Sequence, residues 1–403
     1  MNFSVLKSIP LAPKDPILGI NELYQSDNNS QKINLGVGVY TDEHGRLPLL
    51  QSVRKAEELL TQRPTPRSYL PIEGHNSYNQ QVQHLVFGGD LQAVRENRVV
   101  TVQSLGGTGA LKIGADFLKH FGYQSRIWIS DPSWENHEAL FSSAGFEVLR
   151  YPYYNPNNHG LFFSEMLDVL EQARAGDIVL LHACCHNPTG IDLDSSQWAE
   201  IIALTARKQL VPFLDLAYQG FSKGLEEDRQ AIERFVDSGQ VVFVANSFSK
   251  SFSLYGERVG ALSVVLPDET QAMHVRSQLK RVIRTNYSNP PYFGAQLVND
   301  ILQDVHLRAI WVSELTQMRD RIKQMRQQFV ECLHQHQTIV DFGFILKQAG
   351  MFSYSGLSSE KVKRLRDEYS IYALDSGRIC IAALNLGNVT RVAEAVAAVL
   401  NNS

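Results

Sequence analysis

Short apolar runs alternate with amphipathic segments through the middle of this 403-residue chain, and this alternation constrains the fold more than any other feature. The runs predict strands at residues 126–130, 178–182, 211–215, 241–245 and 261–265. Strands separated by helices form a largely parallel sheet with helices on both faces. The pattern therefore predicts an α/β fold.

A long charged segment, residues 302–337, follows the last of these strands. Apolar side chains recur in it at near-helical spacing: Met318, Ile322, Met325 and Phe329. Such a stripe is typical of helix packing rather than of a binding surface. We interpret the segment as a helix that leads into a second domain, which ends in a strand at residues 378–381 and a terminal helix from about residue 390. The N-terminal segment, up to about residue 45, is expected to fold back onto this second domain.

Composition limits the classes of partner. The formal net charge of -4 provides no basic footprint for nucleic acid, and no apolar run approaches the roughly 20 residues of a membrane span. The first 13 residues lack the apolar core of a secretory signal and are not arginine-rich. Four cysteines show neither disulfide nor zinc spacing, and the adjacent Cys184 and Cys185 are typical of core residues in a reducing compartment. We therefore expect a cytoplasmic protein without a metal site.

Lys250 lies in Ser247-Phe248-Ser249-Lys250-Ser251, just after the apolar run 241–245. A buried strand would deliver its amine to the end of the sheet rather than to open solvent. An amine that is buried or crowded by cations loses its proton more easily and can form an imine with an aldehyde. The motif thus indicates Schiff-base chemistry.

Asp215 ends the apolar run 211–215, and Tyr218 follows three residues later. A carboxylate at the carboxyl end of a strand can pair with a protonated pyridine nitrogen, and the phenol is close enough to reach the same ring. Taken alone, such an aspartate is more often a helix cap or loop carboxylate, and a tyrosine is more often a core residue. Their joint occurrence after one strand favours the functional interpretation.

A glycine-rich segment, residues 105–111, exposes backbone N–H groups and then turns helical. This arrangement forms an anion site at the start of a helix, although glycine-rich turns are frequent. Together with Ser247, Ser249 and Arg258, the segment could enclose one phosphate. The sequence therefore contains candidate contacts for an aldehyde, a pyridine ring and a phosphate.

Eight motifs carry a resemblance that extends from Asp15 to the C-terminal helix. They are Asn34–Tyr40, Gly106–Ala110, Asp131–His137, Cys184–Gly190, Asp215–Phe221, Ser247–Lys250, Arg284–Pro291 and Ser376–Arg378. In these motifs the chain resembles the fold-type I, pyridoxal-phosphate-dependent class I aminotransferases of the aspartate and aromatic amino acid branch. The resemblance implies a mostly parallel seven-stranded sheet in a large domain and a smaller α/β domain. The expected boundaries are 1–45 for the N-terminal arm and first part of the small domain, 46–310 for the large domain, and 311–403 for the interdomain helix and small C-terminal domain.

The resemblance implies that Lys250, Asp215 and Tyr218 are the catalytic residues. Lys250 would hold pyridoxal 5'-phosphate as an internal aldimine and then move a proton between the substrate's α-carbon and the cofactor. Asp215 would keep the ring nitrogen protonated, with His137 as its partner, although a surface histidine is the alternative for His137. Tyr218 and Asn187 would hydrogen-bond the ring's phenolic oxygen.

The other cofactor contacts that the resemblance implies surround the ring and the phosphate. Trp134 would stack on the ring. The phosphate would be held by Gly107, Thr108, Ser247, Ser249 and Arg258, and by Tyr69 reaching from a neighbouring subunit.

Two arginines are implied as substrate contacts, because guanidinium meets carboxylate at two points. Arg378 would bind the α-carboxylate, and Arg284 would bind the distal carboxylate of aspartate, glutamate or 2-oxoglutarate across a dimer interface. Gly38 would offer a backbone N–H to the α-carboxylate, and Trp134 and Asn187 would complete the substrate site. The expected assembly is a homodimer with shared active sites.

Substrate preference is divided between two branches of the family. Residues 69–74, residues 247–258 and Leu47 resemble the aromatic branch, while Val39, Thr108 and Asn289 resemble the aspartate branch. We expect reversible transamination between an aromatic amino acid or aspartate and 2-oxoglutarate, with an aromatic preference. The alternatives are a strict aspartate aminotransferase, another fold-type I lyase, racemase or decarboxylase, and a non-catalytic protein of the same fold. An intact Lys250 argues against the last of these.

Overall fold

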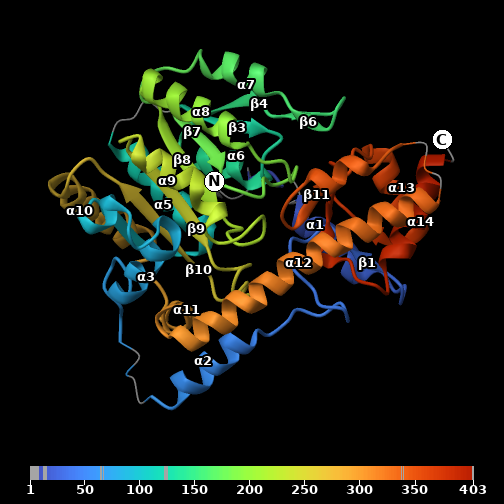
Figure 1. Ribbon diagram of the computed structural model, residues 1–403, viewed down its shortest axis with the longest axis horizontal. Helices are drawn as coiled ribbons and strands as arrows, with labels where there is room; N and C mark the ends of the chain where they lie inside the picture. The colour runs from blue at the N-terminus through green and yellow to red at the C-terminus, as the bar shows by residue number, and fades with distance from the viewer. Residues whose placement is uncertain are drawn as a thin grey trace, which may run out of the picture.

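The computed structural model describes residues 9–11, 16–63, 66, 68–121, 126–336, 338 and 340–401. Asp15, where the family resemblance begins, and residue 337, at the end of the expected long helix, lie outside these residues. Two lobes are joined by one long helix (Figure 1). No helix among the described residues is long and apolar enough to cross a membrane.

A seven-stranded sheet forms the centre of the larger lobe, in the order β2-β10-β9-β8-β7-β3-β4. Its strands are β2 (Val99–Leu105), β3 (Arg126–Asp131), β4 (Glu147–Pro152), β7 (Ile178–His182), β8 (Val211–Leu216), β9 (Val242–Ser247) and β10 (Val259–Val265). β10 runs antiparallel to both of its neighbours, and the pairs from β9 to β4 are parallel. The predicted α/β fold with a mostly parallel seven-stranded sheet is confirmed.

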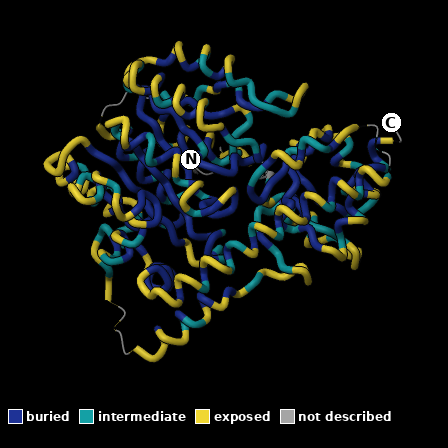
Figure 2. Tube along the Cα trace, in the orientation of Figure 1, coloured by how far each residue is buried: buried dark blue, intermediate teal, exposed yellow. Residues whose placement is uncertain are grey.

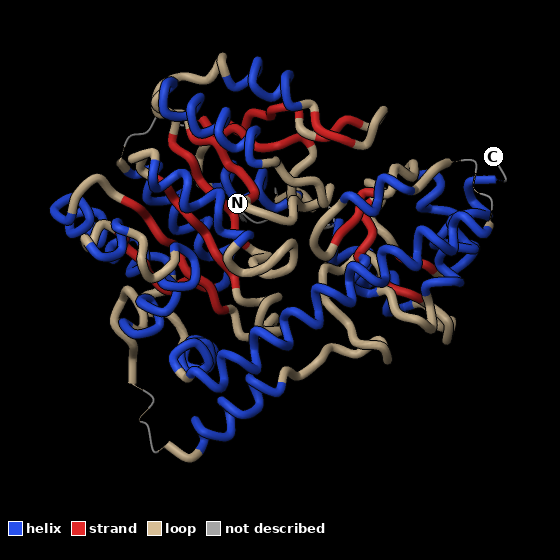
Figure 3. Tube along the Cα trace, in the orientation of Figure 1, coloured by secondary structure: helices blue, strands red, loops and turns tan. Residues whose placement is uncertain are grey.

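Helices cover both faces of this sheet (Figure 3). They are α3 (Asn76–Phe87), α4 (Gln92–Arg95), α5 (Gly106–His120), α6 (Glu135–Ser143), α7 (Phe163–Leu170), α8 (Ser195–Lys208), α9 (Gln230–Asp237), α10 (Glu269–Asn286) and α11 (Phe293–Gln303), with a short turn at Glu227–Arg229. Successive residues of β8 enter separate cores, because side chains alternate across a strand. Phe213 packs in the core of α5 and α10, and Leu214 packs in the core of α8 and α9. Figure 2 shows buried residues concentrated along the sheet and on the inner sides of these helices.

The apolar runs did not reveal β2 and β4. β2 is buried yet contains polar residues that interrupt its apolar pattern. Thr101 Oγ1 lies 2.7 Å from Ser263 Oγ, and Gln103 Nε2 donates to the carbonyl of Pro291 at 2.6 Å. β4 lies at the sheet edge, where Glu147 and Arg150 are exposed. Both strands depend on partners that are distant in sequence.

The helix α12 (Val305–Gln335) extends from the larger lobe into the smaller one (Figure 1). All four residues of the predicted stripe are buried along it: Met318, Ile322, Met325 and Phe329. The predicted helix at 302–337 begins too early, because Leu302 belongs to α11. The carboxylate of Asp304 separates the two helices by accepting from the backbone N–H groups of His306 and Leu307.

The smaller lobe combines C-terminal and N-terminal segments. Its elements are α1 (Pro16–Ser26), β1 (Ile33–Asn34), a 3-10 turn at Gly343–Lys347, β11 (Phe352–Tyr354), α13 (Ser359–Tyr369), β12 (Ile371–Tyr372), β13 (Arg378–Cys380), a 3-10 turn at Ile381–Ala383 and α14 (Val389–Asn401). β11 pairs with β13, and β1 pairs with β12.

Two further parts lie outside the smaller lobe. α2 (Gln51–Thr61) packs beside α11 and α12, and the hairpin of β5 (Tyr154–Asn155) and β6 (Gly160–Leu161) extends from the larger lobe. The domain boundaries at 45/46 and 310/311 stay predictions.

Candidate active site

A cavity of about 240 Å³ lies at the carboxyl ends of β7, β8 and β9. This is the edge where parallel α/β sheets place their ligands. Most of the predicted site residues line it: Gly38, Gly107, Thr108, Trp134, Asn187, Asp215, Tyr218, Ser247, Ser249, Lys250, Arg258 and Arg378. Residues from across the chain, including both lobes, thus meet at one cavity.

Lys250 follows the end of β9 and faces the cavity. Its Nζ lies 5.2 Å from the ring centre of Tyr218 and donates to no acceptor among the described residues. Burial is the main cause that lowers the pKa of Lys250 to about 8; Asp215 opposes this shift, and Arg258 and Arg378 add to it. A substantial neutral fraction of the amine is therefore present near neutral pH, as nucleophilic attack on an aldehyde requires.

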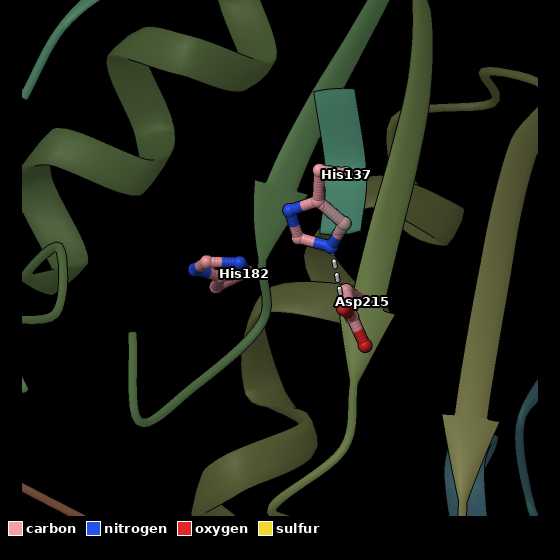
Figure 4. Close-up of side chains that lie close together, drawn as sticks. All are labelled: His137, His182 and Asp215. Atoms are coloured by element: carbon pink, nitrogen blue, oxygen red, sulfur yellow. Dashed lines mark hydrogen bonds and ion pairs between the residues drawn. The ribbon is translucent and has the colours of Figure 1, made fainter. Parts of the chain in front are cut away.

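Asp215 is buried at the end of β8 and accepts a hydrogen bond from His137 (Figure 4). The distance from His137 Nε2 to Asp215 Oδ2 is 2.9 Å, and Ser133 Oγ lies 2.9 Å from the other imidazole nitrogen. Burial alone would raise the pKa of Asp215, but the hydrogen bond and charge of His137, and then His182 and Lys250, lower it overall. The carboxylate therefore stays ionised. His137 is fully buried, so the alternative of a surface histidine is wrong.

His182 is a site residue that the sequence interpretation missed. It is the Cα partner of Asp215 in the β7–β8 register and lines the cavity. Its Nδ1 is buried and has no hydrogen-bond partner among the described residues. Burial, followed by the charge of His137, lowers the pKa of His182 to about 3. The imidazole is therefore neutral. The sequence did contain a signal for His182 as a site residue. His182 ends the predicted strand 178–182, just as Asp215 ends the predicted strand 211–215.

Among the described residues, two groups of side chains have the composition of a metal site. Ligand atoms of His137, His182 and Asp215 lie within 4.8 Å of one another, as do those of Cys184, Cys185 and Asp228. In the first group, His137 Nε2 is already hydrogen-bonded to Asp215. In the second, both carboxylate oxygens of Asp228 accept backbone N–H groups from the loop at residues 220–224.

Arg378 is almost fully buried at the wall of the cavity. Its Nη1 donates to Asn187 Oδ1 at 3.1 Å, and its Nη2 donates to the carbonyl of Gly36 at 2.7 Å. Its Nε has no hydrogen-bond partner in the part of the chain that the structure describes, and the guanidinium lies 4.2 Å from the ring centre of Phe352. Burial lowers the pKa of Arg378, yet the group has no carboxylate in contact. An anionic group entering the cavity would complete this site.

Phe352 is a second residue that the sequence interpretation missed. It lines the cavity from β11 and makes an edge contact with Tyr218, with ring centres 6.0 Å apart. A Cβ on Gly38 would lie 2.6 Å from the Phe352 ring, so only glycine fits there. No sequence pattern connects these residues, because their contact depends on the association of distant segments.

The opposite end of the cavity forms a cradle for an anion. α5 begins at Gly106, whose φ is +68°, and a Cβ there would lie 2.7 Å from Arg258 Nη2. Arg258 Nη1 lies 3.4 Å from Ser249 Oγ, which lies 3.2 Å from Ser247 Oγ. Helix N–H groups, two hydroxyls and a guanidinium therefore converge, as expected for a phosphate site.

Tyr69 and Arg284 lie outside the cavity. They line a separate hollow of about 840 Å³ together with Asn289. Tyr69 is 91% exposed, and Arg284 is exposed with its Nη1 hydrogen-bonded to Ser288 Oγ. The single chain therefore does not bring these two residues to the other predicted site residues. Leu47, expected near the pocket mouth, is 51% exposed and does not line the cavity either.

Comparison with known proteins identifies the family. The sequence profile of aminotransferase class I and II matches residues 30–396. The chain belongs to this family. This aminotransferase is 52% identical to the aspartate aminotransferase of Pseudomonas aeruginosa, over 98% of this chain and 100% of that protein. It is 50% identical to the aromatic-amino-acid aminotransferase of Escherichia coli, over 96% of this chain and 98% of that protein.

A solved structure agrees with the same assignment. The aromatic-amino-acid aminotransferase of Burkholderia pseudomallei, covalently bound to pyridoxal phosphate, superposes with a TM-score of 0.97. It is 54% identical to this aminotransferase, with 99% of this chain and all of that chain covered. The protein is thus a pyridoxal-phosphate-dependent enzyme of the aspartate and aromatic amino acid branch. Its residues fit that cofactor, because Lys250 Nζ donates to no acceptor among the described residues, Asp215 is ionised and a Cβ at Gly106 would crowd Arg258 in the cradle.

Proposed function

We propose that this aminotransferase transfers the amino group reversibly between an aromatic amino acid or aspartate and 2-oxoglutarate. The observation that carries the proposal is the meeting of Lys250, Asp215 and Arg378 around one cavity. These residues come from the two lobes and provide an amine, an anion and a carboxylate receptor. The small amino acids and 2-oxo acids that exchange amino groups require all three.

The residues have separate tasks in this proposal. Pyridoxal phosphate, when bound, supplies an aldehyde that takes up the amino group and a ring that withdraws electrons from the α-carbon. Asp215, held by His137, keeps the proton on the ring nitrogen, since an adjacent anion stabilises a cation. Lys250 would accept the proton from the substrate's α-carbon and deliver it to the C4′ carbon of the cofactor. Arg378 positions the α-carboxylate.

Other residues of the cavity hold and orient the two molecules. Tyr218 and Asn187 would donate to the ring's phenolic oxygen, and Trp134 would cover the ring face; all three line the cavity. The cradle formed by Gly107, Thr108, Ser247, Ser249 and Arg258 would hold the phosphate. Gly38 offers a backbone N–H to the α-carboxylate. Asn187 supports both ligands in this arrangement, because its amide oxygen already accepts from Arg378.

We propose that Tyr69 and Arg284 complete the active site of a second copy in a homodimer. Their position in a hollow away from Lys250, and the exposure of both side chains, support a role across an interface. Mixing Lys250→Ala with Arg284→Asp tests this arrangement. Hybrid dimers would contain one intact site, so refolded equimolar mixtures should recover about a quarter of the wild-type activity. The assay uses aspartate as the donor, for which both parents are impaired, and activity no higher than that of the two parents would overturn the proposal.

Dual specificity is tested by kcat/KM for aspartate and for phenylalanine, each with 2-oxoglutarate, on cofactor-loaded protein. Relatives named for aspartate and for aromatic amino acids are almost equally similar to this chain, at 52% and 50% identity. We expect phenylalanine to equal or exceed aspartate. A preference for aspartate by orders of magnitude would instead identify a strict aspartate aminotransferase.

We also propose that the protein acts in the cytoplasm. All four cysteines are free, including the adjacent and buried Cys184 and Cys185, which agrees with a reducing compartment. Fractionation of the native cells tests this, and recovery of the activity outside the cytoplasm would contradict it.

A further inference from the structure

A second cavity, of about 230 Å³, shares no lining residue with the active-site cavity. Its walls come from three parts of the chain. Ser222 belongs to the loop after β8, Lys323 and Arg326 lie on α12, and Gln348 and Gly350 precede β11. The cavity therefore lies where the larger lobe, the connecting helix and the smaller lobe meet.

Arg326 is the buried charge of this cavity, with 3% of its surface exposed. Its Nη2 donates to the carbonyls of Gly350 at 2.8 Å and Phe352 at 3.2 Å, and its Nε lies 3.4 Å from Ser353 Oγ. All of these acceptors are neutral. Among the described residues, no carboxylate forms an ion pair with Arg326, and its Nη1 has no acceptor.

A buried guanidinium without a counter-charge is unfavourable unless something else compensates it. Burial lowers the pKa of Arg326 to about 10, so the group is still protonated at neutral pH. Asp228, in the turn that follows Ser222, does not line the cavity, and its carboxylate oxygens accept backbone N–H groups from residues 220–224. The positive charge is therefore available to a ligand.

A second cation faces the same space. Lys323 precedes Arg326 by three residues on α12, which places both on one face of the helix. It is exposed, lines the cavity and forms no ion pair with a described residue. The amides of Gln327 and Gln348 and the hydroxyl of Ser222 add neutral hydrogen-bonding groups. One cation in the interior and one at the mouth are suited to an anion that enters from solvent.

We propose that this cavity binds a small oxyanion, a phosphate or a carboxylate, between Arg326 and Lys323. The guanidinium Nη1 would donate from the interior, and the ammonium of Lys323 would close the site from the mouth. The inference is independent of the proposed substrates. Because Arg326 also holds the carbonyls of Gly350 and Phe352, a bound anion would contact the segment that carries Phe352 to the active site.

The test is a calorimetric titration of the cofactor-loaded enzyme with inorganic phosphate, and separately with acetate, at constant ionic strength. Four proteins are compared: wild type, Lys323→Gln, Arg326→Gln and Lys347→Gln. Lys347 is the control, because it is exposed beside the cavity without lining it. Any binding at the active site is common to all four proteins, so the differences report on this cavity alone.

We expect Lys323→Gln to weaken the anion by about tenfold, Arg326→Gln to weaken it further, and Lys347→Gln to leave it unchanged within about twofold. The anion that shows this pattern, phosphate or acetate, tells whether the cavity prefers a phosphate or a carboxylate. Arg326→Gln also loses bonds to two carbonyls, so circular dichroism checks that it folds, and Lys323→Gln decides the question if it does not. Equal dissociation constants for wild type and Lys323→Gln, with both anions, would overturn the proposal.

Thermal unfolding supplies a second readout. A ligand that binds only the folded state raises Tm with concentration. Phosphate, compared with sodium chloride at matched ionic strength, should raise the Tm of wild type and of Lys347→Gln more than that of Lys323→Gln. The same increase in all three proteins would also contradict the assigned site.

Discussion

His137 Nε2 and Asp215 Oδ2 lie 2.9 Å apart in the buried end of the sheet, with the neutral His182 in the adjacent strand (Figure 4). This contact places an ionised carboxylate at the floor of the cavity and restrains its orientation. The charge state of the Asp215 carboxylate therefore depends on residues from three separate elements, α6, β7 and β8.

Asp215→Ala should reduce kcat/KM by roughly 10²-fold or more, the scale for removing one partner of a buried charge pair. His137→Asn should cost only about tenfold, because it removes one hydrogen bond and leaves the carboxylate. Steady-state kinetics of both variants, with cofactor content measured by absorbance, checks this order. Unchanged turnover in Asp215→Ala would mean that the ring nitrogen is not its partner.

Lys250→Ala should remove the absorbance band of lysine-bound cofactor and lower turnover by at least about 10²–10⁴-fold, the range for loss of a positioned proton-transfer group. Spectra and single-turnover rates measure the two effects separately. Lys347→Ala is the matched control, because it removes an exposed lysine that does not line the active-site cavity. Substantial remaining turnover would reject the role of Lys250.

The free energy of unfolding of the cofactor-free protein should depend on pH through Lys250. The pKa of Lys250 is about 8 in the folded protein and 10.5 ordinarily, so between these values the unfolded chain binds more protons. Stability from this group therefore rises with pH across that window and is lowest below it. Urea unfolding at several pH values should show a shallower rise for Lys250→Met than for wild type. Identical slopes would contradict the shifted pKa.

Arg284→Asp should reduce kcat/KM for aspartate and 2-oxoglutarate by about 10²–10³-fold, as expected when a buried carboxylate loses its cation. Turnover of phenylalanine in the first half-reaction should fall far less, because phenylalanine has no distal carboxylate. Arg281→Asp is the control, because it makes the same charge change on the same helix, α10, outside the hollow that Arg284 lines with Tyr69. Equal losses for every substrate would refute the assignment of Arg284.

Gly106→Ala should weaken cofactor binding, because an alanine at φ +68° is strained by about 1–2 kcal/mol and its Cβ would lie 2.7 Å from Arg258 Nη2. Roughly tenfold faster cofactor loss on dialysis is the expected result. Gly256→Ala is the control, since no atom lies within 4 Å of its hypothetical Cβ. Equal retention in both variants would show that the cradle tolerates the side chain.

The sheet was largely predictable where local pattern and burial coincide. The predicted strands around 178–182, 211–215 and 241–245 correspond to β7, β8 and β9, which are apolar because they are buried on both faces, except near the carboxyl ends where polar site residues stand. β2 was not apparent, because the polar groups of Thr101 and Gln103 are satisfied by distant partners. The break between α11 and α12 depended on one capping carboxylate, that of Asp304.

The sequence by itself determined the residue types of the site, because Lys250 and Asp215 each follow an apolar run and the family resemblance implies Arg378. Only the tertiary structure decided their environment. His182 became part of the site through strand register, Phe352 reached it from the other lobe, and Arg326 became a buried cation without a counter-charge. The reason is physical: proximity in sequence sets spacing along one element, whereas burial, register and charge compensation depend on segments that meet only in the folded chain.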